Sequence, residues 1–247
     1  MVNLDAVALN PSWTIAPDPW LGERLGKPAF RLSITDRWNA EALQSHLAQP
    51  GFYEVRVPCD QIDWVKELAQ LGFGVVDTHL LLELPASKAS LKAPTQPIDV
   101  AIAADRPGIV ELAKHAFRYS RFHLDPQVDN AVAGQIKGDW MANCCDGRRG
   151  DRVLVARNAN QPIGFLAALL TQEPEHSVAT IDLIAVDDQV RGRGIGQSLT
   201  CAFMQTYRDQ CSLFRVGTQV ANLPALRLYQ SLGFSIVHSQ YLLHYHA

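Results

Sequence analysis

The sequence predicts an α/β fold, and three observations carry this prediction. An apolar strand over about 179–186 runs through a glycine-rich turn directly into a helix. From Ile98 to the C-terminus, segments with helical apolar spacing alternate with segments of strand character. A helix-strand unit of one pattern also occurs in both halves of the chain. With 47% hydrophobic residues among 247, the chain can bury a core of this kind.

The composition argues against several classes of protein. The formal net charge is −3, whereas nucleic-acid binders usually carry a basic face, so no nucleic-acid partner is expected. No apolar run approaches the roughly 20 residues of a membrane span, and the N-terminus lacks the basic and apolar segments of a secretion signal. The five cysteines are odd in number and lack paired spacing. We therefore expect a cytoplasmic protein without disulfides or a bound metal.

The N-terminal part of the chain contains the first copy of an internal repeat. The tripeptide Leu-Gly-Phe occurs at 71–73 and again at 232–234, each time after an amphipathic helix and at the start of a strand. Glycine suits the position that follows a helix. The first copy has no glycine-rich turn, and Leu68 stands where the second copy has Tyr229. Residues 1–94 are therefore predicted to form a structural companion domain.

A stretch over about 85–97, rich in proline and small polar residues, reads as an interdomain linker. The second domain, 95–247, then begins with a predicted strand over 98–104 and a helix over 105–117. The next segment, 118–126, combines two aromatic residues, two arginines, a histidine and an aspartate in a loop closed by proline. Because loops placed by rigid elements commonly carry recognition groups, this segment is a candidate binding loop.

Another helix over about 128–145 and a hairpin of strands over 152–157 and 162–171 lead to the strand before the glycine-rich turn. After the turn and its helix, a strand is predicted over 212–217. A helix begins at Asn222, a good N-cap residue.

The glycine-rich turn predicts a phosphate site. Gly192, Gly194 and Gly196 let the backbone turn tightly, so that consecutive amides can converge on one anion. The helix that follows adds its positive end, and Arg191 and Arg193 add formal charge beside it.

Two common phosphate-binding folds do not fit this turn. A P-loop ends in Gly-Lys-Ser/Thr, whereas residues 196–198 read Gly-Gln-Ser, without the lysine that reaches terminal phosphates. A dinucleotide fold needs G-x-G-x-x-G and an acidic residue at the end of the next strand, which here ends in Val216 and Gly217. Neither a nucleoside triphosphatase nor a dinucleotide-dependent enzyme is expected.

The pattern Arg-x-x-Gly-x-Gly that starts at Arg191, after a strand ending at Val186, resembles the coenzyme A pyrophosphate loop of the GCN5-related N-acetyltransferases (GNAT). A second signature, from Asn222 to Tyr229, falls where that family places its Asn-x-x-Ala-x-x-x-Tyr helix. The resemblance extends from Ile98 to the C-terminus. It implies the GNAT fold, a mixed twisted sheet flanked by helices, with the N-terminal domain as a smaller degenerate α/β copy.

The resemblance further implies direct transfer of an acetyl group from acetyl-CoA to an amine, without a metal. Tyr229 is the expected acid for the thiolate leaving group, while strand amides hold the pantetheine arm and polarise the thioester. The general base stays open among Asp182, His123 and Asp125. The expected cofactor contacts are Ile184, Ala185, Val186, Arg191, Gly192, Arg193, Gly194, Ile195, Gly196, Gln197 and Asn222.

The two-domain layout and the loop are also similar to the bacterial TDP-fucosamine acetyltransferases, which acetylate the 4-amino group of dTDP-4-amino-4,6-dideoxy-D-galactose for enterobacterial common antigen. Arg118 or Arg121 would then meet the diphosphate, and Tyr119 or Phe122 a ring face, with His123 beside them. A different amine acceptor (peptide, antibiotic or polyamine) and a non-catalytic acyl-CoA-binding protein stay open. A homodimer is compatible with either.

Overall fold

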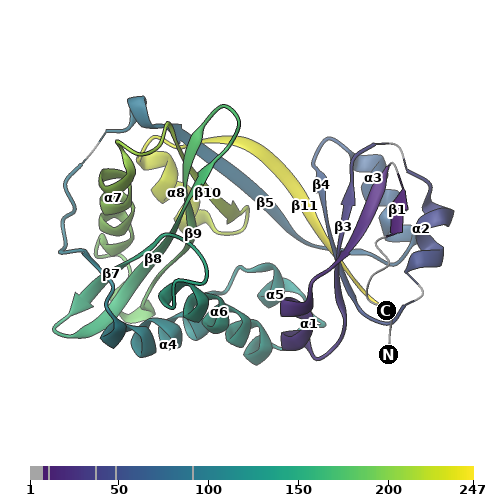
Figure 1. Ribbon diagram of the computed structural model, residues 1–247, viewed down its shortest axis with the longest axis horizontal. Coiled ribbons are helices and arrows are strands. Elements are labelled where there is room, and N and C mark those ends of the chain that lie inside the picture. Colours follow the sequence, from purple (N-terminus) through teal and green to yellow (C-terminus); the bar gives the residue numbers. More distant parts are fainter. Residues whose placement is uncertain (1–7, 11, 37, 48, 91) are drawn as a thin grey trace. The chain divides into compact units, whose positions relative to one another are not determined.

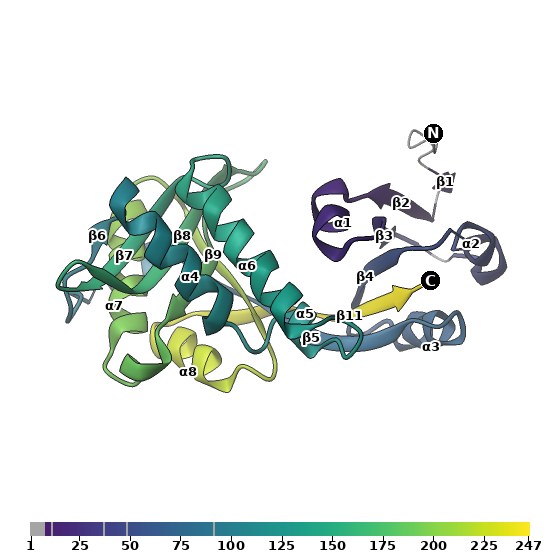
Figure 2. The ribbon, with the colours of Figure 1, turned by 90° about the horizontal axis from the view of Figure 1, so that it is seen from below.

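The computed structural model describes residues 8–10, 12–36, 38–47, 49–90 and 92–247. These residues form two compact units. The first unit contains the described residues up to 79, together with 120–132 and 239–247. The second unit contains the described residues of 80–119 and residues 133–238. Figures 1 and 2 show the elements of each unit.

The first unit is built on a sheet with the strand order β1-β2-β3-β4-β11. Strands β3 and β4 are parallel, and the other neighbours are antiparallel. Its elements are β1 (Ala8–Asn10), β2 (Trp13–Pro17), α1 (Pro19–Leu25), β3 (Ala29–Ile34), α2 (Ala40–His46), β4 (Phe52–Pro58), α3 (Ile62–Gln70), the start of β5 (Gly74–Pro85), α5 (Arg121–Leu124) and the end of β11 (Ser235–His246).

The two faces of this sheet differ in character because side chains alternate along each strand. Val55 of β4 and Leu243 of β11 are fully buried in an apolar core that includes Leu43 of α2 and Leu68 of α3. The intervening positions of β4 and β11 point to the other face and carry Glu54, Arg56, His244 and His246. One face is therefore the main apolar core of the unit, and the opposite face carries these charged and polar groups together with the buried Phe52 and Leu242.

The second unit contains a mixed sheet flanked by helices, as predicted. Its strand order is β5-β10-β9-β8-β7-β6, with β9 and β10 parallel and the strands from β6 to β9 antiparallel. Its elements are the end of β5, η1 (Ala86–Lys88), β6 (Asp99–Val100), η2 (Ala103–Asp105), α4 (Arg106–Ala116), most of α6 (Asn130–Cys145), β7 (Arg152–Asn158), β8 (Gln161–Gln172), β9 (Ser177–Val186), η3 (Asp188–Val190), α7 (Ile195–Tyr207), β10 (Leu213–Gln219), α8 (Leu223–Ser231) and the start of β11.

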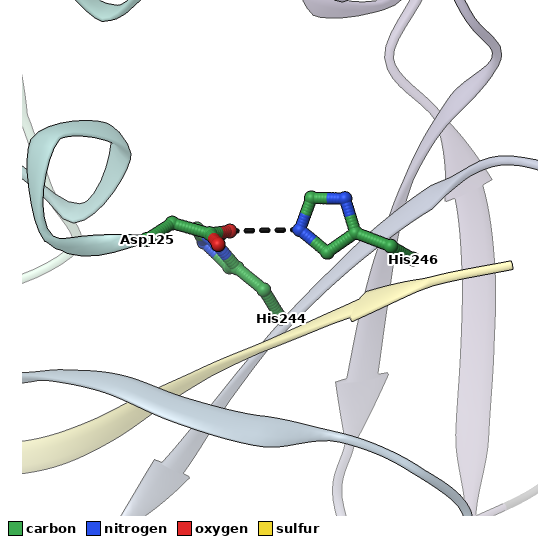
Figure 3. Close-up of side chains that lie close together, drawn as sticks. All are labelled: Asp125, His244 and His246. Atoms are coloured by element: carbon green, nitrogen blue, oxygen red, sulfur yellow. Dashed lines mark hydrogen bonds and ion pairs between the residues drawn. The ribbon is translucent and has the colours of Figure 1, made fainter. Parts of the chain in front are cut away.

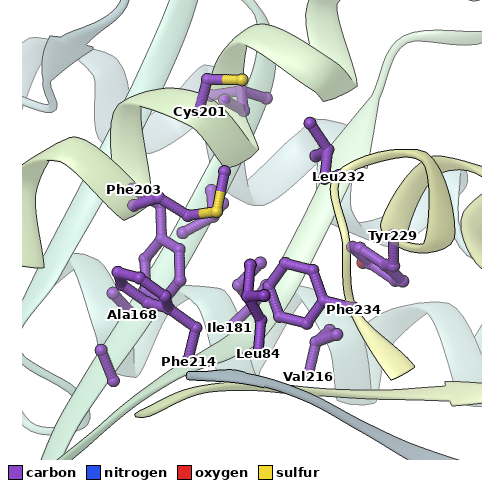
Figure 4. Close-up of a cluster of buried hydrophobic side chains, with 14 of the residues drawn as sticks. Leu84, Ala168, Ile181, Cys201, Phe203, Phe214, Val216, Tyr229, Leu232 and Phe234 are labelled. Carbon is purple, nitrogen blue, oxygen red and sulfur yellow. The ribbon is translucent and has the colours of Figure 1, made fainter. Parts of the chain in front are cut away.

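Separate apolar cores lie on the two faces of this sheet. One joins α7 and α8 to the sheet and includes Phe203, Phe214 and Phe234 (Figure 4). The other joins α4 and α6 to the opposite face and includes Ile109 and Phe165. The strands between them are buried on both sides, which explains their near-continuous apolar sequence.

The internal repeat is confirmed in the local structure. Helices α3 and α8 have the same length, as do strands β5 and β11, with 9 and 12 residues. Gly72 and Gly233 have φ values of 96° and 95°, which glycine adopts without strain. The following phenylalanine amides bond to the carbonyls of Leu68 and Tyr229, at 3.0 Å each. Strand β5 of the first copy ends in the second unit, and strand β11 of the second copy ends in the first unit.

The units are therefore not contiguous in sequence. The division into contiguous domains, 1–94 and 95–247, stays a prediction. The described residues of the predicted linker, 85–97, belong to the second unit. The strand predicted over 98–104 is reduced to two residues, because an Asp105 carboxylate oxygen accepts the Ile102 amide at 2.7 Å and starts a helical turn there. The loop predicted over 118–126 contains the short helix α5.

None of the described helices combines the length and apolar character needed to cross a bilayer. The prediction on secretion signals concerns the N-terminus, where residues 1–7 and 11 lie outside the described residues.

Candidate functional site

The glycine-rich turn has the backbone conformation that its sequence predicts. Gly192 and Gly194 have φ values of 78° and 79°, which residues with a Cβ rarely adopt. Gly194 is the N-cap of α7, which begins at Ile195. The turn thus places the N-terminus of a 13-residue helix directly behind two left-handed glycines.

The backbone amides of this turn are available to a ligand. Within the described part of the chain, none of the amides from Gly192 to Gln197 donates to a protein acceptor. Three of them belong to the first turn of α7, where the helix dipole adds positive potential. Consecutive free amides at a helix N-terminus are a binding site for phosphate groups.

The two arginines of the turn have different roles. The Arg191 guanidinium donates to the Ala116 carbonyl at 2.9 Å and the Val186 carbonyl at 3.2 Å, and it pairs with Asp188 at 2.6 Å. Arg191 therefore holds the turn in place. The Arg193 side chain is exposed and makes no contact of this kind to the described residues, so it is the arginine free to meet an anion.

A β-bulge reshapes β9 just before the turn. Ala167 of β8 lies opposite Leu183, whereas Ala168 lies opposite Ile181, so Asp182 is an extra residue in β9. One extra residue moves the side chains that follow to the other face of the sheet. Accordingly, Ile181 packs in the core beneath α7 and α8, and Leu183 packs in the core beneath α4 and α6.

Beyond the bulge, the parallel strands β9 and β10 separate. They pair as far as Ile181 and Val216, although β9 continues to Val186 and β10 to Gln219. Among the described residues, the edge of β9 that faces β10 therefore has no strand partner over its last residues. An extended ligand with amide groups can bind such an edge as a strand would.

Asp182 is fixed by a set of polar contacts that the sequence did not reveal. Arg149 donates through two nitrogens to its two carboxylate oxygens, both at 2.7 Å, and Trp140 Nε1 donates to one of them at 2.9 Å. The Asp182 side chain is only 7% exposed. Both oxygens are thus occupied, which argues against Asp182 as a general base and gives it the role of anchoring the bulge.

Replacement of Asp182 by Asn should misplace the strand edge. We expect kcat/KM for the predicted acetyl transfer to fall about tenfold to a hundredfold, because small displacements of binding groups have effects of that size. Circular dichroism on the folded variant checks that the loss is local. Asp146→Asn is the matched control. Asp146 follows α6, the helix that carries Trp140, and pairs with Arg106 and Arg148. Equal losses in both variants would contradict an anchoring role for Asp182.

Helix α8 places Asn222 and Tyr229. The Asn222 side chain caps the helix by accepting the Ala225 amide at 3.4 Å. Tyr229 is only 2% exposed and packs near Phe234 (Figure 4). Burial raises the pKa of the Tyr229 phenol, which keeps it protonated, and its hydroxyl has no hydrogen-bond partner among the described residues. Tyr229 is therefore a buried proton donor without an internal acceptor.

Of the residues expected to contact the acceptor, Arg118 and Tyr119 lie in the second unit. Arg118 forms a close ion pair with Asp188, the same aspartate that pairs with Arg191. The Tyr119 ring is 37% exposed. Arg118 is thus tied to the turn that carries the free amides, and Tyr119 is open to a ligand.

The other three acceptor candidates lie in the first unit, on α5. Ser120 caps this helix, and its hydroxyl lies 2.6 Å from His123 Nδ1. Phe122 is 1% exposed, so its ring face is not open to a ligand here. Arg121 stacks on Phe122, 4.4 Å from the ring centroid, and its Nε lies 2.8 Å from the buried carboxylate of Glu54.

A buried triad in the first unit combines Asp125 with His244 and His246 of β11 (Figure 3). His244 Nδ1 and His246 Nε2 lie 2.7 and 2.8 Å from the same oxygen of Asp125. Burial alone would raise the pKa of the Asp125 carboxyl, but hydrogen bonds from His244, the Gln127 amide and His246 hold it well below its usual range. Such a carboxylate is a weak base.

The residue types of this triad would also suit a metal ion, since their ligand atoms lie within 4.8 Å of one another. The Lys27 ammonium lies 3.0 Å from His246 Nδ1, which must then accept, so His246 Nε2 carries the proton donated to Asp125. A metal at Nε2 would require the opposite tautomer and the displacement of Lys27. The hydrogen-bonded arrangement satisfies all these contacts.

A family model, two relatives and one solved structure show what this chain is similar to. Residues 109–234 match the model of the family described as acetyltransferase (GNAT) family. The spore coat polysaccharide biosynthesis protein SpsD of Bacillus subtilis is 29% identical over 79% of this chain and 67% of its own length. The dTDP-fucosamine acetyltransferase of Escherichia coli is 30% identical over 72% of this chain and 74% of its own. A GCN5-related N-acetyltransferase from Sphaerobacter thermophilus superposes with a TM-score of 0.64 at 14% identity, covering 95% of this chain and 76% of its own.

Proposed function

Since the chain belongs to the GNAT acetyltransferase family and is an acyltransferase, we propose that it transfers the acetyl group of acetyl-CoA to the amino group of a nucleotide-linked amino sugar. One observation carries the cofactor part of this proposal: free amides at the start of α7 stand next to the unpaired edge of β9. A diphosphate fits the first group, and the amide-containing pantetheine arm fits the second.

The proposed reaction is a direct transfer. The neutral amine attacks the thioester carbonyl carbon, and the carbon–sulfur bond breaks as the amide forms. The nitrogen loses one proton to water, the thiolate gains one from a general acid, and that acid regains its proton from solvent. Amides of the β9 edge polarise the carbonyl oxygen, where negative charge develops. We assign the donation to the leaving thiolate to Tyr229, because its phenol is protonated and has no internal acceptor among the described residues.

The cofactor contacts are proposed from the same geometry. The pyrophosphate would meet the amides from Gly192 to Gln197 and the free Arg193 side chain, whereas Arg191 would act by holding the turn. Backbone groups of Ile184, Ala185 and Val186 would meet the pantetheine arm, and Asn222 would place the helix that carries Tyr229.

Support for the acceptor comes from two relatives. One is named for the acetylation of dTDP-fucosamine and the other for the biosynthesis of a spore coat polysaccharide. We therefore propose dTDP-4-amino-4,6-dideoxy-D-galactose as the substrate, and enterobacterial common antigen as the product pathway. Arg118 and Tyr119 are both exposed, and Arg118 pairs with Asp188 just before the cofactor turn, so these two are the proposed contacts of the acceptor in the second unit.

A thiol-release assay with acetyl-CoA tests this proposal. The acceptor panel contains dTDP-4-amino-4,6-dideoxy-D-galactose, its epimer at carbon 4, a mixture of peptides, and polyamines. We expect turnover with the galactose-configured sugar at least tenfold faster than with its epimer, and none with peptides or polyamines.

Other outcomes would contradict distinct parts of the proposal. Preference for a peptide or a polyamine would keep the acetyltransferase and replace the acceptor. Binding of acetyl-CoA by calorimetry without turnover of any amine would favour a non-catalytic acyl-CoA-binding protein.

A further inference from the structure

The segment predicted as a linker packs against α7, the helix that follows the phosphate-binding turn. The Ser198 hydroxyl of α7 accepts the amides of Thr95 and Gln96 at 3.1 and 3.2 Å and lies 3.0 Å from the Thr95 hydroxyl. Two turns further along, the Gln205 side chain donates to the Lys92 carbonyl at 3.3 Å. The segment from Lys92 to Gln96 is thus held along α7 within the second unit, rather than lying free in solvent.

A small cavity lies between this segment and the first turns of α7. It has a volume of about 140 Å³ and is lined by Lys92, Ala93, Thr95, Gln197, Ser198 and Cys201. Pockets that hold whole ligands are usually about 300 Å³ or larger, so this one suits a single chemical group of a ligand bound beside it. None of the residues that line it is acidic.

The charge of the cavity favours an anion. The Lys92 ammonium has no ion-pair partner among the described residues, and the side chain is exposed. Gln197 stands in the first turn of α7, where the helix dipole is positive. The cavity also borders the free amides, because Thr95 Oγ1 lies 3.4 Å from where a Cβ on Gly194 would stand. A cation, a helix N-terminus and hydroxyl groups therefore surround a space next to the site for the pyrophosphate.

We propose that Lys92, together with Thr95 and Gln197, binds the 3′-phosphate of coenzyme A. This proposal rests on the proposed function for the identity of the cofactor, and it adds a second anionic group that the enzyme recognises. The free amides of the turn serve the pyrophosphate, which coenzyme A shares with dephospho-coenzyme A. Lys92 serves the one phosphate in which the two molecules differ, so this segment acts as part of the cofactor site.

Calorimetric titration of the full chain with coenzyme A and with dephospho-coenzyme A tests the assignment. We expect the wild type to bind coenzyme A about tenfold to a hundredfold more tightly, as charge-assisted hydrogen bonds to a phosphate contribute on that scale. Lys92→Gln should remove most of that difference by weakening only the binding of coenzyme A. Lys88→Gln is the matched control, because Lys88 is an exposed lysine of the same segment and does not line the cavity.

The outcomes separate this assignment from the function on which it rests. Equal affinity of the wild type for both cofactors, or equal weakening of both by Lys92→Gln, would overturn the role of Lys92 and leave the acetyltransferase intact. Failure of the wild type to bind either cofactor would instead overturn the proposed acetyl-CoA site. Both lysine variants change exposed side chains, so thermal denaturation should show wild-type stability.

Discussion

Gly194→Asp should abolish measurable binding of acetyl-CoA, with a loss of affinity of about a thousandfold. The new carboxylate would stand at the N-cap of α7, beside the amides that are free to receive the pyrophosphate. Two like charges about 4 Å apart near a protein surface repel by about 4 kcal/mol, which corresponds to that factor. Calorimetric titration with acetyl-CoA measures the loss.

Two control variants separate charge from backbone strain. Gly194→Asn introduces a side chain with nearly the shape of Asp but without its charge. Asp and Asn both tolerate a left-handed backbone better than most other residues. Gly147→Asp introduces the same residue at a φ of 68° at the end of α6, where no other atom lies within 4 Å of a Cβ. We expect the first control to retain most of the affinity and the second to retain all of it. Similar affinities for the Asp and Asn variants at 194 would contradict the electrostatic argument.

The phosphate turn could be predicted from the sequence because its determinants are local. Glycines at positions 192 and 194 adopt left-handed conformations, and the helix begins where the apolar spacing begins. The helix-strand repeat is equally local, so its capping geometry was visible in the Leu-Gly-Phe tripeptides. Short-range backbone preferences thus account for the part of the site that was predicted.

The contacts that shape β9 could not be predicted, because they join residues far apart in sequence. Asp182 meets Arg149 across 33 residues and Trp140 across 42. A bulge also leaves no mark in an apolar pattern that is buried on both faces, since either register keeps the same residues inside. The bulged position differs from the rest of the strand only in carrying its single charged residue, Asp182.

Helix α8 buries residues from both of the faces that its spacing distinguishes. Its spacing places Ala225, Leu228 and Leu232 on one face, and Leu226 and Tyr229 on another. In the structure Leu226, Tyr229 and Leu232 are buried, and Ala225 and Leu228 are partly buried and pack against the same core. The helix has apolar residues on most of its surface, so periodicity alone did not fix its orientation.

The contacts around α5 also could not be predicted, because they join residues far apart in sequence. Asp125 meets His244 across 119 residues, and Arg121 pairs with the buried Glu54 of strand β4. The alternation of His244 and His246 on one strand was visible, since residues two apart share a face. Which carboxylate these two histidines contact depends on the fold, because the end of β11 belongs to the first unit.

Tyr229→Phe should lower the turnover number about a hundredfold or more while changing the affinity for acetyl-CoA by less than about threefold. General acids typically contribute factors of this size, and the substitution removes only one oxygen. The raised pKa that burial gives Tyr229 means that the hydroxyl acts as a protonated donor to the thiolate as the bond to sulfur breaks. Steady-state kinetics, with cofactor affinity from calorimetry, measures both quantities.

Tyr207→Phe is the matched control, because Tyr207 is a fully buried tyrosine of the same unit whose pKa is also raised, first by burial. Its hydroxyl donates to Asp151, so the loss should appear in stability and leave turnover nearly unchanged. Unchanged turnover in the Tyr229 variant would remove that residue from the acid role. A parallel loss of cofactor affinity would instead mean that the hydroxyl positions acetyl-CoA. The Tyr229 hydroxyl has no hydrogen-bond acceptor among the described residues. A selective loss of turnover is expected only if the leaving sulfur is that acceptor.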